Sequence, residues 1–208
     1  MKTTLPRIYP ITDTAISGLS HFEQVRRLIE GGANLIQLRE KRLGAGEWLE
    51  DAANAVQFAK SRGVTILIND RVDMAIALGA DGVHLGQNDL PPAAARRILG
   101  PDAIIGFSTH SLEQMRLAIR MPVDYFGFGP VFSTKTKPDS DPVVGLELLR
   151  RARREASGRP LVAIGGITGQ NVHKVIDAGA DSAAMITAIL SPGHRITENL
   201  QTLLNSHR

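Results

Sequence analysis

The stretch Gly79-Ala80-Asp81-Gly82-Val83 decides the fold, because its pattern recurs twice elsewhere in the chain. Gly32-Ala33-Asn34-Leu35-Ile36 and Gly179-Ala180-Asp181-Ser182-Ala183 keep the same order, and each follows a segment of helical character. Glycine can end a helix in a left-handed conformation, and Asn or Asp makes the turn into the apolar residues that follow. The repeat therefore predicts a chain that alternates helix, turn and buried strand.

Working outward from this repeat, eight apolar runs of strand length can be placed along the 208 residues. Most are nearly continuous, as expected for parallel strands that are covered on both faces. Ser20 and Ser111 are good helix N-caps, and Pro91 and Pro92 suit a first helical turn. We expect strands at 8–12, 34–39, 65–69, 82–85, 103–108, 125–129, 161–165 and 182–187, and helices at 21–30, 47–62, 71–78, 91–99, 112–120, 146–156, 170–178 and 196–205. This order predicts an α/β fold, a (β/α)8 TIM barrel, as a single domain over residues 1–208.

Composition narrows the class of protein. Apolar residues make up 43% and charged residues 22%, which is typical of globular domains, and there is no cysteine for disulfide or thiol chemistry. No apolar run is long enough to span a membrane, and the N-terminus lacks the apolar stretch of a signal peptide, so we expect a cytoplasmic enzyme. The net charge of +3 argues against a nucleic-acid partner, and we expect the basic residues Arg150, Arg151, Arg153 and Arg154 to lie on a solvated helix face. Composition does not decide whether the protein forms a homo-oligomer, which remains possible.

Charged side chains stand where the predicted strands end. Gln37, Arg39 and Lys41 are spaced two apart and should share one face, which would place two cations near the rim of a barrel. Unpaired buried cations are costly. They either pair with carboxylates such as Glu40 and Asp70 or bind an anionic ligand, and we favour the ligand.

Two carboxylates follow neighbouring strands, Asp70 after the third and Asp89 after the fourth. Magnesium prefers a few protein carboxylates together with waters and substrate phosphate oxygens, and this pair fits that sparse arrangement. The alternative is that Asp70 and Asp89 cap the helices that begin near Arg71 and Pro91.

Later strand ends suggest a second anion site. Gly165-Gly166-Ile167 offers bare backbone N–H groups, and Ile186-Thr187-Ala188 would complete a phosphate site of the kind frequent in this fold. Thr134, Thr136 and Lys137 lie in the longest loop, which is either a ligand contact or a solvated turn. His84 is better explained as a packed or orienting residue than as a general base. Two anion sites suit a reaction between a diphosphate and a monophosphate, in which magnesium and cations stabilise the departing diphosphate.

Taken together, these motifs resemble the thiamine phosphate synthase family, from Tyr9-Pro10-Ile11-Thr12-Asp13 to Ile186-Thr187-Ala188-Ile189. The most specific of them are 37–41, 69–71, 84–89, 129–132, 134–137 and 165–167. The family joins 4-amino-2-methyl-5-hydroxymethylpyrimidine diphosphate to 4-methyl-5-(2-hydroxyethyl)thiazole phosphate. The resemblance implies a transferase that loses diphosphate first and then captures the pyrimidine cation with the thiazole nitrogen.

The resemblance also implies roles for individual residues. Asp70 and Asp89 would hold Mg2+, and Gln37 would hold the pyrimidine. The diphosphate would be contacted by Arg39, Lys41, Asn69, Ser108 and Lys137, of which Arg39, Lys41, Ser108 and Lys137 would be catalytic. Thr134 and Thr136 would approach the thiazole, whose phosphate would lie at Gly166, Ile186 and Thr187.

This chain departs from the family in three places. Thr187 stands where serine is frequent, and Ala183 and Ala184 are smaller than usual. Two alternatives remain. One is a thiazole tautomerase paralogue, which carries a histidine where this chain has Pro130, and the other is a non-catalytic barrel that binds a phosphate ligand.

Overall fold

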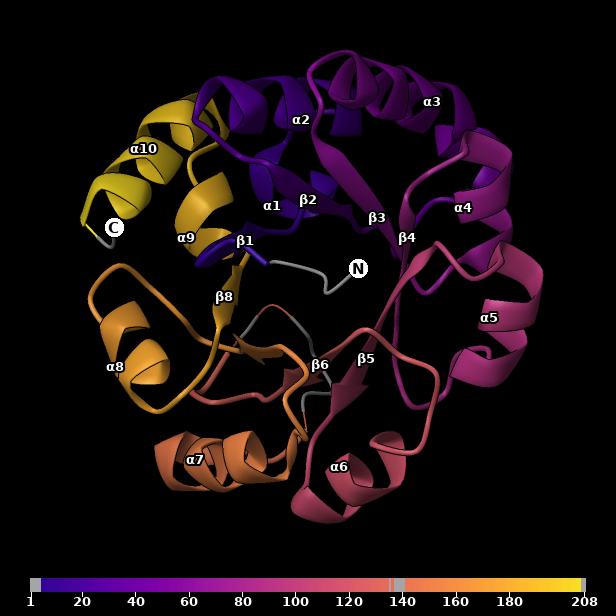
Figure 1. Ribbon diagram of the computed structural model, residues 1–208. Coiled ribbons are helices and arrows are strands. Elements are labelled where there is room, and N and C mark those ends of the chain that lie inside the picture. The colour runs from indigo at the N-terminus through magenta and orange to yellow at the C-terminus, as the bar shows by residue number, and fades with distance from the viewer. Residues whose placement is uncertain (1–4, 135, 137–140, 207–208) are drawn as a thin grey trace.

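The computed structural model describes residues 5–134, 136 and 141–206, and these form a ring of parallel strands inside a ring of helices (Figure 1). The strands pair in the order β1-β8-β7-β6-β5-β4-β3-β2, all in parallel. A parallel bridge between Ile11 and Gln37, with the Thr12 N–H donating to the Gln37 carbonyl at 2.9 Å, brings β1 and β2 together. The predicted single-domain (β/α)8 barrel is confirmed.

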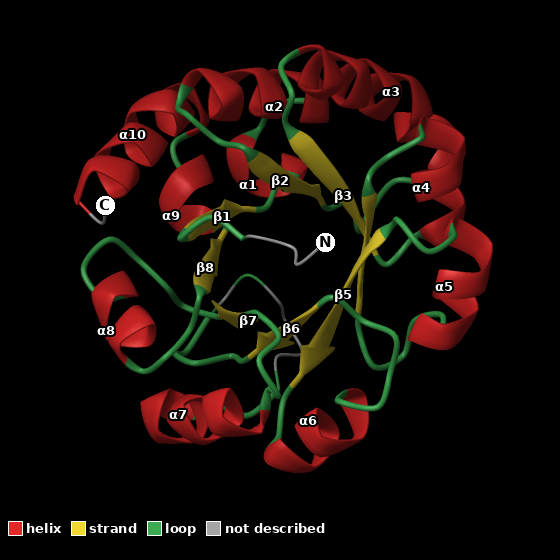
Figure 2. Ribbon diagram, in the orientation of Figure 1, coloured by secondary structure: helices red, strands yellow, loops and turns green. Residues whose placement is uncertain are grey.

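Strands and helices alternate along the chain, as Figure 2 shows by colour. The strands are β1 (Ile8–Pro10), β2 (Leu35–Leu38), β3 (Thr65–Asn69), β4 (Gly82–Leu85), β5 (Ile104–Thr109), β6 (Tyr125–Phe128), β7 (Leu161–Ile164) and β8 (Ser182–Met185). The helices are α1 (Thr14–Ser17), α2 (His21–Glu30), α3 (Ala45–Ser61), α4 (Val72–Leu78), α5 (Pro92–Leu99), α6 (Leu112–Ala118), α7 (Gly145–Glu155), α8 (Val172–Asp177), α9 (Thr187–Leu190) and α10 (Ile196–Ser206), with a 3-10 turn η1 (Gly193–Arg195). None of the described helices is long and apolar enough to cross a membrane.

Most element boundaries agree with the sequence pattern, and the differences are local. β3, β4 and α2 have the predicted bounds, and Ser20 and Ser111 cap α2 and α6 as expected. The short helices α1 and α9 were not predicted, and the predicted strand over 182–187 ends at Met185 because α9 begins at Thr187.

The core has two layers. The larger layer packs the outward faces of the strands against the helices, and it includes Ile36 and Leu38 of β2. The smaller one fills the barrel interior with Tyr9, Ile11, Leu35, Leu67, Tyr125, Val162 and Ala184. Alternation along each strand therefore separates a helix-facing set from an interior set, and Gln37 belongs to the interior. Ala183 and Ala184 are both buried, one in each layer.

The aspartates of the repeated turns bind the start of the preceding strand. The carboxylates of Asp81 and Asp181 accept the backbone N–H groups of Ile66 and Leu161, each at 2.7 Å. Asp124, which precedes β6, accepts the Ile105 N–H at the same distance. A carboxylate thus satisfies a backbone donor that would otherwise lack a partner at the amino-terminal end of the barrel.

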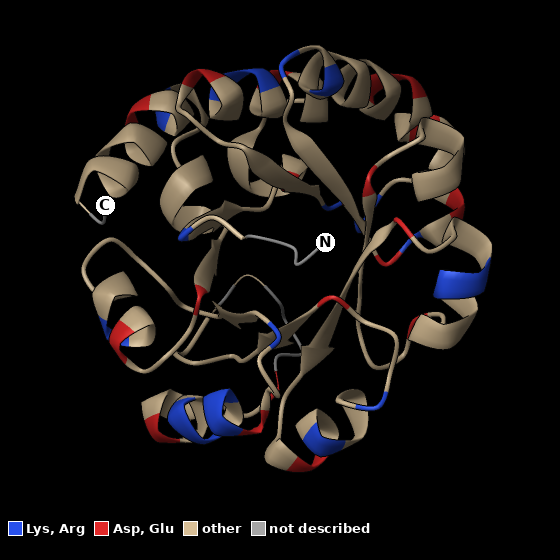
Figure 3. Cartoon of the chain, viewed as in Figure 1, with Lys and Arg blue, Asp and Glu red and all other residues tan. Residues whose placement is uncertain are grey.

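The basic residues of α7 lie on the outer ring, where Lys and Arg alternate with Asp and Glu around the helices (Figure 3). Arg150, Arg151 and Arg154 are exposed, in agreement with the predicted solvated face. Arg153 differs, because its guanidinium pairs with Asp181 and also donates to the Arg159 carbonyl at 3.3 Å.

Substituting Asp181→Ala should lower the free energy of unfolding by about 1–3 kcal/mol, because it leaves the Leu161 N–H unsatisfied and Arg153 unpaired. Urea denaturation followed by circular dichroism measures the change. Asp177→Ala, at an exposed carboxylate of α8, is the matched control and should shift the value by less than about 0.5 kcal/mol. Equal effects of the two substitutions would contradict this role of Asp181.

Candidate active site

The segment after β2 presents the predicted polar side chains at the carboxyl end of the barrel. Gln37 is 2% exposed, and its amide Nε2 donates to the Tyr9 hydroxyl at 2.9 Å. Arg39 forms an ion pair with Asp13, and Lys41 forms one with Asp70. Both cations therefore have carboxylate partners in this structure, as the alternative interpretation of the sequence anticipated.

The Glu40 carboxylate fixes the backbone of this segment. It accepts the backbone N–H groups of Lys41, Arg42 and Leu43 at 2.8, 2.7 and 3.3 Å. It also accepts the Thr14 hydroxyl and contacts His21. Burial pushes the pKa of Glu40 upward, but these hydrogen bonds outweigh burial and the pKa is lowered. The ionised carboxylate therefore fixes the backbone that carries Arg39 and Lys41.

Asp70 and Asp89 meet at the ends of β3 and β4. The pKa of Asp89 is raised mainly by burial and in part by the nearby Asp70 carboxyl, while the hydrogen bond from the Gly86 N–H at 2.7 Å opposes the rise. Asp70 has a left-handed φ of 62°, which is uncommon for a residue other than glycine. Neither carboxylate caps a helix, since α4 and α5 begin after Arg71 and Pro91 without a side-chain cap bond. The capping alternative is therefore wrong for both residues.

A half-buried histidine of β4 lies between these carboxylates and β5. His84 Nε2 contacts the Ser108 hydroxyl at 2.8 Å, and Nδ1 contacts the Tyr125 hydroxyl at 2.9 Å. Burial is the main reason that the pKa of His84 falls to about 4, so the ring is neutral near pH 7. Asn69 stands beside His84 in the strand register. This arrangement fits the interpretation of His84 as an orienting residue.

The later strand ends form the other half of the site. The hydroxyls of Thr136 and Thr187 lie 3.2 Å apart, and the Thr134 hydroxyl accepts the Thr136 N–H at 3.2 Å. Ile186 precedes Thr187 as the N-cap residue of α9. The structure therefore joins the loop after β6 to the segment after β8, as the proposed phosphate site requires.

Gly166 can only be glycine. Its φ is +62°, and a Cβ there would overlap the Ser133 carbonyl and the Phe132 side chain. Asn171 holds the turn, because its side-chain amide donates to the Gly166 carbonyl at 3.0 Å and accepts the Thr168 N–H at 2.8 Å. The bare backbone after β7 is thus packed directly against the loop after β6. Lys137, the remaining predicted diphosphate contact, lies outside the described residues.

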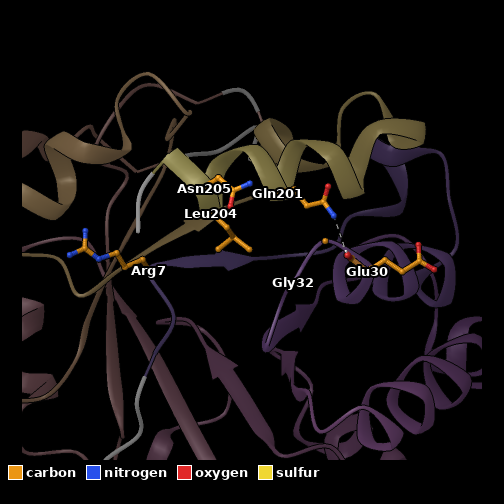
Figure 4. A pocket seen from close by; sticks show the side chains of 7 residues that line it. Arg7, Glu30, Gly32, Gln201, Leu204 and Asn205 are labelled. Atoms are coloured by element: carbon orange, nitrogen blue, oxygen red, sulfur yellow. Dashed lines mark hydrogen bonds between the residues drawn. The ribbon is translucent and has the colours of Figure 1, made fainter.

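Two cavities differ in their relation to this site. One of about 370 Å3 is lined by Asp70 and by neighbouring residues of α4 and α5. The other, of about 740 Å3, is lined by Arg7, which precedes β1, by Gly32, which precedes β2, and by residues of α10 (Figure 4). It sits at the amino-terminal end of the strands, opposite the candidate site.

Within the described residues, no group of three or more His, Asp or Glu side chains forms a metal cluster. The donor set at Asp70 and Asp89 still fits a magnesium ion that takes its other ligands from water and phosphate. Two neighbouring carboxylates repel each other unless a proton or a cation lies between them. A divalent cation would relieve this repulsion.

Sequence reasoning missed three residues that touch the site, namely Tyr9, Asp13 and Tyr125. Tyr9 holds Gln37, Asp13 pairs with Arg39, and Tyr125 holds His84. Alternation in β1 and β6 could have placed both tyrosines in the barrel interior, where a phenolic hydroxyl needs a partner.

Comparisons with known proteins agree with this geometry. The profile of the family described as thiamine monophosphate synthase matches residues 8–189. A thiamine-phosphate synthase of Koribacter versatilis is 47% identical, covering 96% of each chain, and one of Methanocella arvoryzae is 43% identical, covering 97% of this chain and 96% of the relative. A solved thiamine phosphate pyrophosphorylase from Pyrococcus furiosus superposes with a TM-score of 0.82 at 37% identity, covering 96% and 95% of the two chains. With its barrel and its paired strand-end clusters, this chain belongs to the thiamine monophosphate synthase family.

Proposed function

We propose that this chain joins the pyrimidine diphosphate and the thiazole phosphate to give thiamine phosphate and diphosphate, with Mg2+ at Asp70 and Asp89. The chain is a transferase of thiamine biosynthesis, in line with relatives 42–47% identical over most of its length. The observation that best supports the proposed site is the ion pair between Lys41 and Asp70, beside Asp89, whose pKa is raised mainly by burial and in part by Asp70. It gathers two metal-ligand carboxylates and a cation at one point of the barrel rim.

The first half of the site would bind and release the diphosphate. Mg2+, when bound, neutralises charge on the departing group. Arg39, Lys41 and Lys137 would add positive charge, while Asn69 and Ser108 would donate hydrogen bonds to phosphate oxygens. Gln37 would hold the pyrimidine, because its Nε2 is used by Tyr9 and its carbonyl oxygen remains to accept from an amino group.

The second half would hold the thiazole phosphate until the pyrimidine cation forms. Gly166, Ile186 and Thr187 would bind the phosphate, with Thr134 and Thr136 approaching the thiazole. The hydroxyl contact between Thr136 and Thr187 supports this assignment, because it places donors from two loops within reach of one anion. The reaction needs no protein nucleophile, since the thiazole nitrogen is the nucleophile.

The paralogous tautomerase reaction has less support. Pro130 occupies the position after Gly129 where the tautomerase carries its acid–base histidine, and proline has no ionisable side chain.

We also propose that the enzyme works in the cytoplasm, where its small phosphorylated substrates would be found.

Purified protein should form thiamine phosphate from the two substrates in a Mg2+-dependent reaction. Asp70→Ala and Asp89→Ala should each raise the Mg2+ concentration for half-maximal rate by about 10- to 100-fold, because each removes a proposed ligand. Asp73→Ala, at an exposed carboxylate on α4, is the control and should leave that concentration unchanged. Unaltered Mg2+ dependence in both aspartate variants would rule out the metal assignment.

Thr187→Val should raise KM for the thiazole phosphate by about 10-fold and leave KM for the pyrimidine diphosphate unchanged, since a lost hydrogen bond to a charged group costs about 1.5 kcal/mol or more. Thr187→Ser keeps the hydroxyl and should retain the wild-type value. Initial rates at varied concentrations of each substrate provide the measurement. A change confined to the pyrimidine diphosphate would place Thr187 in the other half of the site.

A further inference from the structure

A continuous chain of hydrogen bonds crosses the barrel interior between the two ends of the proposed pyrimidine diphosphate site. It begins at Gln37, passes through Tyr9 and Tyr125 to His84, and ends at Ser108. Its four links measure 2.9, 3.0, 2.9 and 2.8 Å. Tyr9 and Tyr125 are 1% and 0% exposed, so both hydroxyls are shielded from solvent.

The chain has a direction, because Gln37 Nε2 can only donate. The Tyr9 oxygen accepts that hydrogen bond, and Tyr125 is the one acceptor among the described partners of this buried hydroxyl, so Tyr9 gives its own hydrogen to Tyr125. Tyr125 in turn donates to His84 Nδ1. The neutral ring then carries its hydrogen on Nε2 and donates to the Ser108 oxygen.

This direction determines whether the Ser108 hydroxyl, at the end of the chain of hydrogen bonds, is free to donate or to accept. Its oxygen accepts from His84, so its own hydrogen is directed to a group outside the chain. A donor is favoured over an acceptor where negative charge develops on a departing diphosphate.

Two glycines make room for the chain. A Cβ at Gly106 of β5 would overlap the Tyr125 ring and His84 Nδ1. A Cβ at Gly127 of β6 would lie 3.2 Å from His84 Cε1 and 3.4 Å from the Ser108 hydroxyl. Glycine inside a strand often marks such a close approach. The neighbouring strands are thus shaped around the histidine and its two partners.

We propose that His84 is a positioning residue, held by Tyr125 and through it by Tyr9, which sets the Ser108 hydroxyl as a hydrogen-bond donor to the departing diphosphate. The proposal rests on the proposed function, since it assigns Ser108 the diphosphate of that reaction. It deepens the function by joining Gln37, on the pyrimidine, to Ser108, on the leaving group, through one hydrogen-bonded chain.

A double-mutant cycle tests whether His84 acts through Ser108. Ser108→Ala should lower kcat by about 100-fold, the loss typical of one donor to developing charge. His84→Asn should cause a loss of the same order, because its shorter side chain reaches Tyr125 but not Ser108. The double variant should be no slower than Ser108→Ala alone, while KM for the thiazole phosphate stays at the wild-type value. Losses that multiply in the double variant would overturn the proposal.

Rescue provides the second readout. His84→Gln places an amide N–H near the position of Nε2 and should restore kcat to within about 10-fold of wild type, as expected if one hydrogen bond is what matters. His173→Asn, at an exposed histidine of α8, is the matched control and should match wild type. Thermal melting of every variant identifies loss of fold. Equal losses in folded His84→Asn and His84→Gln, or wild-type kcat in His84→Asn, would each contradict the proposal.

The same series of variants distinguishes a failure of the proposed function from a failure of the proposed role of His84. If wild-type protein forms no thiamine phosphate, the proposed function fails and this inference fails with it. If wild-type turnover is normal and only the ratios between variants deviate, the function stands and the role of His84 is wrong.

Discussion

The parallel bridge between Ile11 and Gln37 closes the barrel, and the polar half of the candidate site depends on that closure. It brings the segment after β1 against the segment after β2. Asp13 then reaches Arg39, and the Thr12 hydroxyl accepts the Arg39 N–H at 3.2 Å. Without this contact, the half-buried guanidinium of Arg39 would lack its counter-ion, at a cost in free energy. The contact that closes the barrel therefore also places Arg39, the proposed diphosphate ligand.

Much of the fold could be predicted because its signals are local and repeated. The Gly-Ala-Asp turns, the apolar strand runs and caps such as Ser20 each need only a few neighbouring residues to be recognised. The helices α1 and α9 were not predicted, because four residues are too few to show a helical period. Asp13, which caps α1 through its carboxylate, and Gly18 at its end were the available signals.

The site could be predicted only in part: the positions of its residues follow from the fold, but their partners do not. Strand ends gather on one face, so Gln37, Asp70 and Ser108 could be placed together without knowing a single contact. Which side chains hold them could not be predicted, because those partners are far apart in sequence and depend on register. Tyr9 and Tyr125 are separated by 116 positions yet share a hydrogen bond. The left-handed backbone of Asp70 was equally hidden, since asparagine and aspartate adopt it only where the surrounding structure demands it.

The ion pairs of this structure bear on how an anion would enter. Lys41 is bound to Asp70, so a diphosphate that recruits Lys41 must first compete with a carboxylate. A divalent cation at Asp70 and Asp89, as proposed, would remove that competition, because it would satisfy both carboxylates and leave the ammonium available. Arg39 differs, since its partner Asp13 is also bound to the N–H groups of Ala15 and Ile16 and stays in place. The two cations therefore differ: Arg39 is fixed by the fold, whereas Lys41 would become available to a diphosphate once the proposed metal binds.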